Sequence, residues 1–398
     1  MARLRNAAAP SGVGLARLSA IGRGVSLLAD PVRRDRSPGI DCLRGALALY
    51  VVCTHVLPWA QYLGTTTTPV TQLNAWLIRI FQGHAETNPA VLGFIVLSGY
   101  CIHRNGLRAE SRNVRAYAIR RAFRIVPVYL LGCAVGVALL AGAGPTAHVL
   151  TGTPTLSLSG LLAKLTAIGA VVPSAYAPSF QGNAPLVTVA AEMWLYALYV
   201  VLIGRWRMLW PVVAVIWLAA FLFVVDDPTY LGWWSIGSVV GFLPYWWLGA
   251  LFVNPSFVGR RRSVLIAAGV LWLALSIALD RHTGSMLVVE ARKLMLAVLI
   301  GGMIVRLDGA HHDVLAAGSK IGRAGYSIYA LHAPIIVALL VAGVAWPLCA
   351  LAAVLTALVS FAAYERPLLR AGARIAARST PAHDSRVEIS GRGEAQRP

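Results

Sequence analysis

Residues 39–60 read GIDCLRGALALYVVCTHVLPWA, and this stretch decides the class of fold. From Leu43 to Ala60 it is long and apolar enough to cross a lipid bilayer, which takes about 20 such residues in a helix. Yet Arg44 lies near its start and His55 lies inside it. A charged side chain at the centre of a membrane span costs about 2.5–3.5 kcal/mol on insertion scales, so such residues usually have a function.

Arg44 and His55 are 11 positions apart. At 100° per residue they lie about 20° apart on the helix surface, and the rise between them is about 16 Å. If Arg44 lies at the cytosolic surface, His55 lies near the middle of the membrane. One helix face then carries an anion-binding group at the cytosolic mouth and an acid–base group deep inside. Arg44 alone would also fit an ordinary positively charged flank.

The composition of the whole chain agrees with a membrane protein. Hydrophobic residues make up 58% and charged residues 13% of the 398 residues, and the mean hydropathy is +0.67. These values exclude an ordinary soluble domain and predict a polytopic membrane protein. The formal charge of +19 follows from 35 Lys and Arg against 16 Asp and Glu. Basic cytosolic loops explain that excess, so we expect no nucleic-acid partner.

Apolar windows along the chain predict an all-α, polytopic helix bundle with about ten transmembrane helices. The windows are residues 43–62, 90–102, 125–142, 186–203, 209–225, 236–253, 263–279, 287–305, 326–344 and 347–364. Basic clusters such as residues 103–124 all fall on one side if the N-terminus is inside, so we expect both termini in the cytoplasm. The expected domains are a basic tail at 1–39, a transmembrane domain at 40–370 and a disordered tail at 371–398. Residues 156–172 are apolar as well and are expected to form an interfacial or re-entrant helix.

A second ionisable residue, Glu192, lies about two turns into the window 186–203. Counted from the outer side, this is a depth that His55 could share. A carboxylate can orient an imidazole and raise its basicity, which predicts Glu192 and His55 as catalytic residues. A structural hydrogen-bonding role for Glu192 is the alternative, and the spacing leaves contact between the two residues open.

Two arginines stand three residues apart in the stretch YAIRRAFRIVPVY, residues 117–129. Arg121 and Arg124 share a helix face at this spacing. Paired guanidinium groups suit phosphate oxygens, so we expect them to bind a phosphorylated ligand, with lipid headgroup contact as the alternative. The five cysteines show no metal-ligand spacing, and we expect neither a disulfide nor a metal site.

Further ionisable residues lie in or beside the predicted spans. His332 precedes Pro334 by two positions, and we expect it to satisfy carbonyl groups that the proline frees, with catalysis as the alternative. Glu365, at the end of the last span, is expected to anchor the helix at the interface. An outer-side group could pair internally or line an acceptor site; it consists of Glu290, Arg292 and Lys293.

Several of these stretches together resemble the membrane acyltransferase-3 family, the O-antigen and exopolysaccharide O-acetylase type. GIDCLRGALALYVVCTH is similar to the family's IDGLRG…VVxxH helix, and GFIVLSGYCI to its FFVLSGFLI segment. RRAFRIVPVY resembles RRxxRIxPxY, and VTVAAEMWLY resembles WSLSVEExxY. GYSIYALHAPI is similar to SYxxYLxHxP, and YERP to the closing ERP. The six matches occur in the family's order and reach from about 39 to 367.

The resemblance implies a ten-helix enzyme of the bacterial inner membrane that uses cytosolic acyl-CoA as donor. Such enzymes pass an acyl group, usually acetyl, to a hydroxyl of a glycan or a lipid-linked sugar. Position by position, His55 matches the family's essential histidine. Arg44, Arg121 and Arg124 match arginines implicated in handling the CoA donor. Glu192 aligns with the first acid of the family's paired stretch, although Met193 stands where the second acid is common.

Two rival functions remain open at this point. A glycolipid transporter or flippase could use His55 and Glu192 as a proton-coupled pair, but the sequence has no internal repeat of the kind that transporters with inverted halves show. An acyltransferase could instead modify a small molecule such as a macrolide. The ordered motif series favours an O-acyltransferase with a glycan or glycolipid acceptor.

Overall fold

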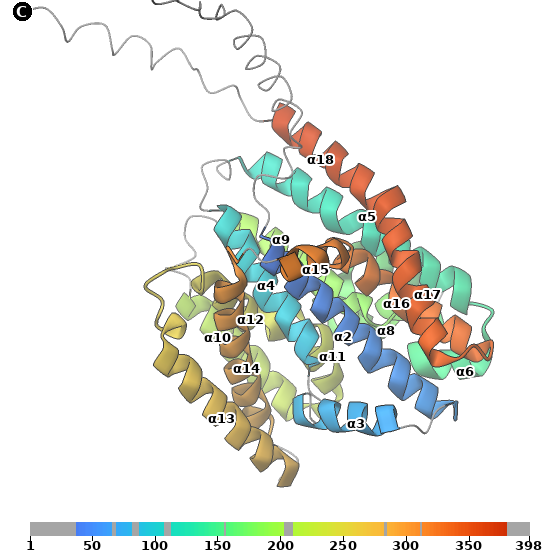
Figure 1. The fold of residues 1–398 in the computed structure, drawn as a ribbon, viewed down its shortest axis with the longest axis horizontal. Helices are drawn as coiled ribbons and strands as arrows, with labels where there is room; N and C mark the ends of the chain where they lie inside the picture. The colour runs from blue at the N-terminus through green and yellow to red at the C-terminus, as the bar shows by residue number, and fades with distance from the viewer. Residues whose placement is uncertain are drawn as a thin grey trace, which may run out of the picture. The chain divides into compact units, whose positions relative to one another are not determined.

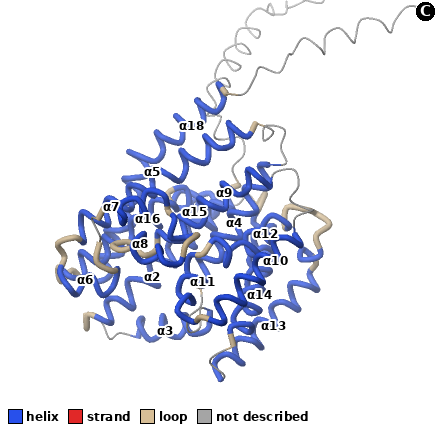
Figure 2. The backbone as a smooth tube through the Cα atoms, turned by 180° about the vertical axis from the view of Figure 1, so that it is seen from behind, coloured by secondary structure: helices blue, strands red, loops and turns tan. Residues whose placement is uncertain are grey.

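The computed structural model describes residues 37–65, 69–81, 87–106, 113–154, 157–202, 210–281, 285–310 and 313–379. Every secondary-structure element within these ranges is helical (Figures 1 and 2). The all-α fold class is therefore confirmed. The predicted N-terminal tail lies outside the described residues up to position 36.

A helix occupies each of the ten predicted windows. The longer helices are α2 (Pro38–Tyr62), α3 (Pro69–Phe81), α4 (Pro89–Gly106), α5 (Val114–Leu140), α9 (Leu186–Leu202), α10 (Trp210–Asp226), α12 (Val239–Leu251), α13 (Arg262–Arg281), α14 (Met286–Leu307), α15 (Asp313–Arg323), α16 (Gly325–Val341), α17 (Trp346–Ser360) and α18 (Arg366–Arg378). Shorter helices connect them, namely α6 (Gly144–Thr151), α7 (Leu158–Thr166), α8 (Tyr176–Phe180) and α11 (Leu231–Gly237).

Fewer described helices are long and apolar enough to span a bilayer than the sequence predicted. Three stretches meet both conditions, Pro38–Tyr62, Val114–Leu140 and Trp346–Arg378, and the bent pair α15–α16 adds a fourth. The predicted span 236–253 is broken at Ser238, between α11 and α12. The described part of the chain is thus a multi-pass membrane bundle, but it does not establish ten spans.

Helix α2 begins at Pro38, before the predicted window 43–62, at residues suited to a helix start. The hydroxyl of Ser37 accepts a hydrogen bond from the Ile40 amide at 3.4 Å, and Pro38 occupies the first helical turn, where its missing N–H is not needed. The helix packs against α4, α15, α16 and α17. Figure 1 shows α15 lying against it. This central place lets the residues of α2 reach several other helices.

Glycines bring α2 and α15 into backbone contact. A Cβ atom on Gly322 would lie 1.5 Å from the carbonyl oxygen of Asp41, and one on Gly45 would lie 2.9 Å from the Gly322 nitrogen. No larger residue fits at Gly322 without moving one of the helices. Because α15 leads directly into α16 at a 58° bend, this contact sets where α16 begins beside α2.

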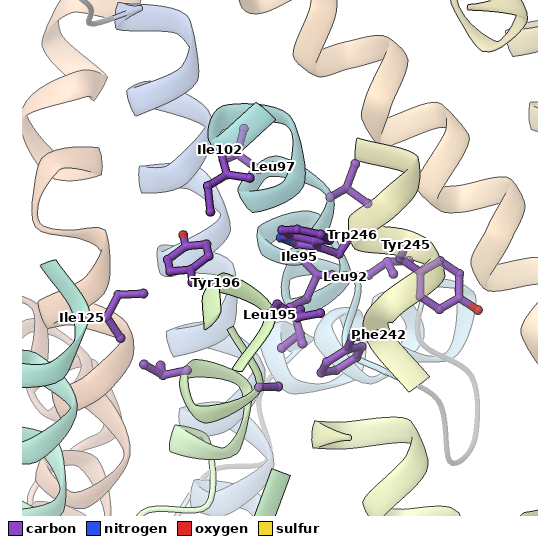
Figure 3. Packing of buried hydrophobic residues seen from close by; sticks show 14 of the residues in the cluster. Leu92, Ile95, Leu97, Ile102, Ile125, Leu195, Tyr196, Phe242, Tyr245 and Trp246 are labelled. Carbon is purple, nitrogen blue, oxygen red and sulfur yellow. The ribbon is translucent and has the colours of Figure 1, made fainter. Parts of the chain in front are cut away.

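Helices α4 and α12 approach each other equally closely. A Cβ atom on Gly99 would lie 1.9 Å from the Trp246 carbonyl oxygen, and one on Gly249 would lie 2.0 Å from the Val96 carbonyl oxygen. Figure 3 shows the side chains of the surrounding core, with Trp246 beside Ile95. Large aromatic rings and small residues thus alternate in this core, as interlocking packing requires.

The apolar stretch 156–172 forms two short helical pieces. α7 is followed by a 3₁₀ turn at Ile168–Ala170, and Ala167 between them has a φ of 53°. Lys164 of α7 is 4% exposed and donates hydrogen bonds to the carbonyls of Ser179 and Gln181, at 3.3 and 3.2 Å. Burial lowers the pKa of its amine. Each of these helical pieces is too short to cross a bilayer.

The last described helix extends past residue 371, where the predicted tail begins. A five-residue π-helix, Phe361–Glu365, joins α17 to α18, which runs to Arg378. α18 packs along α5, where Gly372 lies against Phe123. Residues 371–378 are therefore helical, because packing on α5 stabilises them. Residues 380–398 lie outside the described part of the chain.

Candidate active site

Five helices meet around a pocket of about 570 Å³, counting its open mouth. Its walls are Arg44 of α2, Phe94, Leu97, Ser98 and Cys101 of α4, Arg121 and Arg124 of α5, Thr188, Val189, Glu192 and Tyr196 of α9, and Gly325, Tyr326 and Tyr329 of α16. Four of the five predicted site residues thus line one pocket.

Arg44 is held in the pocket wall by neighbours on two helices. Its Nη1 donates to Asp41 Oδ1 at 2.8 Å, one turn earlier in α2. Its Nη2 donates to the sulfur of Cys101 on α4 at 3.1 Å. Asp41 therefore has a specific role beyond starting the helix. The ion pair fixes the direction of the guanidinium and balances its charge.

The two arginines of α5 lie over aromatic rings. The guanidinium carbon of Arg124 lies 4.9 Å from the ring centre of Tyr326, and that of Arg121 lies 5.2 Å from the ring centre of Tyr196. Both contacts are cation–π interactions, which orient a guanidinium without neutralising it. With Arg44 paired to Asp41, the lining still holds Arg121 and Arg124 against one carboxylate, Glu192, so the pocket wall suits an anion.

Glu192 is buried in a network of hydroxyl groups. It accepts a hydrogen bond from the hydroxyl of Tyr196, one turn further along α9. The Tyr196 oxygen lies 3.1 Å from Ser98 Oγ, which donates to it, and 3.2 Å from the Tyr326 oxygen. These contacts link α4, α9 and α16 across the pocket. The carboxylate is therefore fixed among the arginines rather than beside the predicted histidine.

His55 lies between two other rings. Its ring centre is 4.9 Å from that of Trp59 and 5.0 Å from that of His332 on α16. Its Nδ1 lies 3.0 Å from the carbonyl oxygen of Val51 and 3.0 Å from Nε2 of His332. A carbonyl oxygen only accepts, so Nδ1 must carry the proton when the ring is neutral. The lone pair of neutral His55 is then on Nε2.

The hydrogen bonds of His332 lead independently to the same assignment. Its Nδ1 lies 2.8 Å from the carbonyl oxygen of Tyr329 and 3.1 Å from that of Ile328, so Nδ1 carries its proton. Its Nε2 is then an acceptor, and it faces the Nδ1–H of His55. Two sets of backbone carbonyls thus fix both tautomers, and they leave Nε2 of His55 able to take a proton.

The structure does not support the expected structural role of His332. Pro334 frees the carbonyl of Ala330, four residues earlier, and Asn183 Nδ2 donates to that oxygen at 2.8 Å. His332 is not needed there. The prediction was wrong because Asn183 comes from a connecting segment, whose contact with α16 the sequence does not reveal.

His55 does not line the arginine pocket. His332 lies between His55 and Tyr329, a residue of the pocket wall. Tyr329 forms part of that wall, and its ring centre is 5.8 Å from that of His332. Among the described residues, no hydrogen bond or ring contact joins His55 to Glu192. The predicted face of α2 is confirmed, because Gly325 of α16 approaches the backbone and Cβ of Arg44 while His332 of α16 meets His55.

The outer-side group forms a closed cluster of its own. Lys293 donates to Glu290 Oε1 at 2.7 Å, and Trp234 Nε1 donates to the same oxygen at 2.9 Å. The hydroxyl of Tyr245 donates to the other carboxylate oxygen. Arg292 donates to Ser276 Oγ at 2.8 Å. Internal pairing, one of the two predicted alternatives, is observed for Glu290 and Lys293, whereas Arg292 contacts α13.

Glu365, which was expected to anchor the helix at the interface, is bonded inside the bundle instead. It is 2% exposed and accepts a hydrogen bond from Ser327 Oγ of α16 at 2.6 Å. The π-helix turns this carboxylate inward, which helical periodicity alone does not predict.

Sequence reasoning also missed the tyrosines that surround the pocket. Tyr196 stands four residues after Glu192, a spacing at which helical side chains meet, and this signal was available. Tyr326 and Tyr329 come from α16, and their place beside α5 and α9 depends on tertiary packing.

Comparison with known proteins gives one match. The model of the acyltransferase-3 family, described as an acyltransferase domain, matches residues 37–365. No curated protein and no solved structure matches the chain. The matched range holds the arginine pocket, the histidine pair and Glu365. The chain therefore belongs to the acyltransferase-3 family, and it is a multi-pass membrane acyltransferase.

Proposed function

We propose that the protein is an O-acyltransferase of the bacterial inner membrane, with both termini in the cytoplasm. It moves an acyl group, which we take to be acetyl, from cytosolic acyl-CoA to a hydroxyl of a glycan or lipid-linked sugar. The observation that carries this proposal is the His55–His332 pair, whose backbone contacts keep Nε2 of His55 unprotonated. Acyl transfer to a hydroxyl needs such a base.

The arginine pocket supports acyl-CoA as the donor. CoA carries several phosphate groups, and Arg44, Arg121 and Arg124 line one pocket together. Guanidinium groups bind phosphate oxygens through paired, charge-assisted hydrogen bonds. The apolar side chains Phe94 and Leu97 in the same pocket suit the less polar arm that ends in the thioester. In this arrangement the thioester points from the pocket toward the histidine pair.

In the proposed transfer, one residue, His55, supplies both proton-transfer steps. Nε2 of His55 takes the proton of the acceptor hydroxyl as its oxygen attacks the thioester carbonyl. The new C–O bond forms, the C–S bond breaks, and the leaving thiolate takes the proton from the imidazolium to give free CoA. Positive charge on His55 is shared with His332 through the Nδ1–Nε2 contact. Alternatively, Nε2 attacks the thioester first and passes the acyl group on, which uses the same lone pair.

The identity of the acceptor is tested by supplying labelled acetyl-CoA and determining which molecule receives the labelled acetyl group. Membranes that contain the protein are incubated with acetyl-CoA labelled in the acetyl group, beside membranes that lack it. The proposal predicts labelled ester in glycan or lipid-linked sugar, with O-acetyl signals in the NMR spectrum of the surface polysaccharide. Label found only in a small molecule would reject the glycan acceptor. No transfer from acetyl-CoA, with transport of a glycolipid instead, would reject the enzyme.

A further inference from the structure

Glu365 is a buried carboxylate that the proposed reaction does not yet use. It is the last residue of the π-helix Phe361–Glu365, and its residue surface is 2% exposed. π-Helical turns are rare within helices and frequently occur at functional sites. Ionisable residues buried in membrane proteins need partners, since an unpaired charge there is costly. The partners of Glu365 therefore indicate what it does.

Its contacts lead to the wall of the arginine pocket. Ser327 Oγ donates to Glu365 Oε2 at 2.6 Å, and Ser327 is fully buried. The residue before it, Tyr326, lies in the pocket wall beneath the guanidinium of Arg124. Glu365 is an electrostatic neighbour of Arg124, although the two form no direct ion pair among the described residues. Glu365 is thus hydrogen-bonded to the residue that follows Tyr326, behind the pocket wall.

A second contact joins the π-helix to the helix that carries Arg124. The hydroxyl of Tyr364 lies 3.5 Å from the carbonyl oxygen of Pro127 on α5 and donates to it. Pro127 stands three residues after Arg124. The π-helix is therefore held at α5 and α16 at once, beside the arginine.

The pocket needs such a carboxylate because its arginines repel one another. Arg44 and Arg124 are close enough for each to raise the energy of the other's charge. Arg44 has Asp41 at 2.8 Å as its counter-charge. The carboxyl group of Glu365 lies behind the pocket wall, farther from Arg124 than a direct ion pair, and acts on its charge from there. A long Arg side chain also loses much rotamer freedom when it is fixed, so a partner must hold it in place before a ligand binds.

We propose that Glu365 is a positioning residue that holds Arg124 over Tyr326 and so sets the affinity of the pocket for the phosphate groups of acyl-CoA. This inference rests on the proposed donor. It predicts that Glu365 acts on donor binding and leaves the chemical step at His55 nearly unchanged. A purely structural carboxylate would change stability, but would not act specifically on the donor.

The test measures binding of labelled acetyl-CoA to the purified full-length protein in lipid nanodiscs, together with kcat and the two KM values. Glu365→Gln keeps the shape and the Ser327 hydrogen bond but removes the charge. We expect its Kd and KM for acetyl-CoA to rise about tenfold, with kcat and the acceptor KM within about twofold. Asp308→Asn is the matched control, since Asp308 pairs with Arg104 at 2.8 Å and does not line the pocket.

A double-mutant cycle distinguishes a positioning role of Glu365 from a purely structural role. If Glu365 acts through Arg124, Glu365→Gln adds no further loss of affinity to an Arg124→Gln variant. Losses that add, or a Glu365→Gln variant with unchanged affinity, would overturn the inference. If Glu365→Gln fails to fold, Ser327→Ala takes its place, with an expected rise in Kd of about two- to fivefold. Failure of the wild-type protein to bind acetyl-CoA would instead reject the proposed function.

Discussion

At the residue scale, the histidine of α2 is paired differently from the sequence-based prediction. The sequence left contact between Glu192 and His55 open; the partner of His55 is His332, and Glu192 lies among the arginines. Depth in the membrane, which the sequence indicates, does not fix the rotation of one helix about another. The pairing depends on how α16 turns after its bend at Ala324. Only the folded arrangement of the helices could reveal it.

The histidine pair leads to a prediction for His332. His332→Ala removes the ring that shares the positive charge of His55 during transfer, so we expect kcat to fall about 10- to 100-fold while the KM for acetyl-CoA stays within about twofold. His332→Gln keeps a side-chain acceptor near Nδ1 of His55 and should retain more activity than His332→Ala. Steady-state kinetics of the purified enzyme measures both. Equal kcat for His332→Ala and wild type would show that the pair does not matter for catalysis.

The arginine pocket leads to a different kinetic result. Arg121→Gln removes a charge from the pocket without touching the histidines, so the KM for acetyl-CoA should rise about 10-fold or more. Raising the salt concentration should weaken acetyl-CoA binding to wild type more than to this variant. Arg262→Gln, at the exposed start of α13, is the control. A KM that is unchanged in Arg121→Gln would remove this residue from the donor site.

At the element scale, most helices could be predicted, but their breaks could not. Hydrophobic windows located helices near 43–62, 125–142 and 347–364 because membrane helices need long apolar runs. The break at Ser238 and the π-helix at Phe361–Glu365 depend on local packing that no periodicity shows. The motifs predicted that Arg44, Arg121 and Arg124 belong to one site. The structure agrees, because α2 and α5 bring the three side chains to the same pocket. The role of Asn183 depends on a segment outside any predicted span.

The contact of α2 with α15 predicts a strict requirement for glycine. Gly322→Ala would place a methyl group 1.5 Å from the Asp41 carbonyl oxygen, so one helix must move. We expect a loss of about 1–3 kcal/mol in stability and lower activity, because α15 places α16 and His332. The apparent melting temperature in detergent and kcat measure the two effects. Gly269→Ala is the control, as its new Cβ would lie 3.8 Å from the nearest atom, a Leu299 methyl carbon. Equal melting temperatures for both variants would contradict this account of the packing.

The buried ion pair of α14 predicts a loss of stability rather than of chemistry. Lys293→Met leaves Glu290 buried without its counter-charge, and breaking such a pair costs about 3–5 kcal/mol. Lys293→Met combined with Glu290→Gln removes both charges and should recover part of that loss. Thermal unfolding of the purified variants measures the difference. A double variant less stable than the single one would contradict the role assigned to the pair.

At the scale of the whole molecule, α16 connects the two halves of the site. Tyr326 and Tyr329 form part of the arginine pocket, and His332, on the same helix, holds His55. Tyr329 of the pocket wall contacts the ring of His332, which in turn contacts His55.

The central claim is that Nε2 of His55 carries out the transfer. Single-turnover transfer from acetyl-labelled CoA, measured in nanodiscs for wild type, His55→Ala and His148→Ala, tests it most directly. His148 lies on α6 and binds the Leu140 carbonyl, away from the site, so its variant is the matched control. We predict a fall of about 10²–10⁴-fold in the transfer rate for His55→Ala, with unchanged binding of acetyl-CoA, and a wild-type rate for His148→Ala. A His55→Ala variant that transfers the label at the wild-type rate would contradict the account.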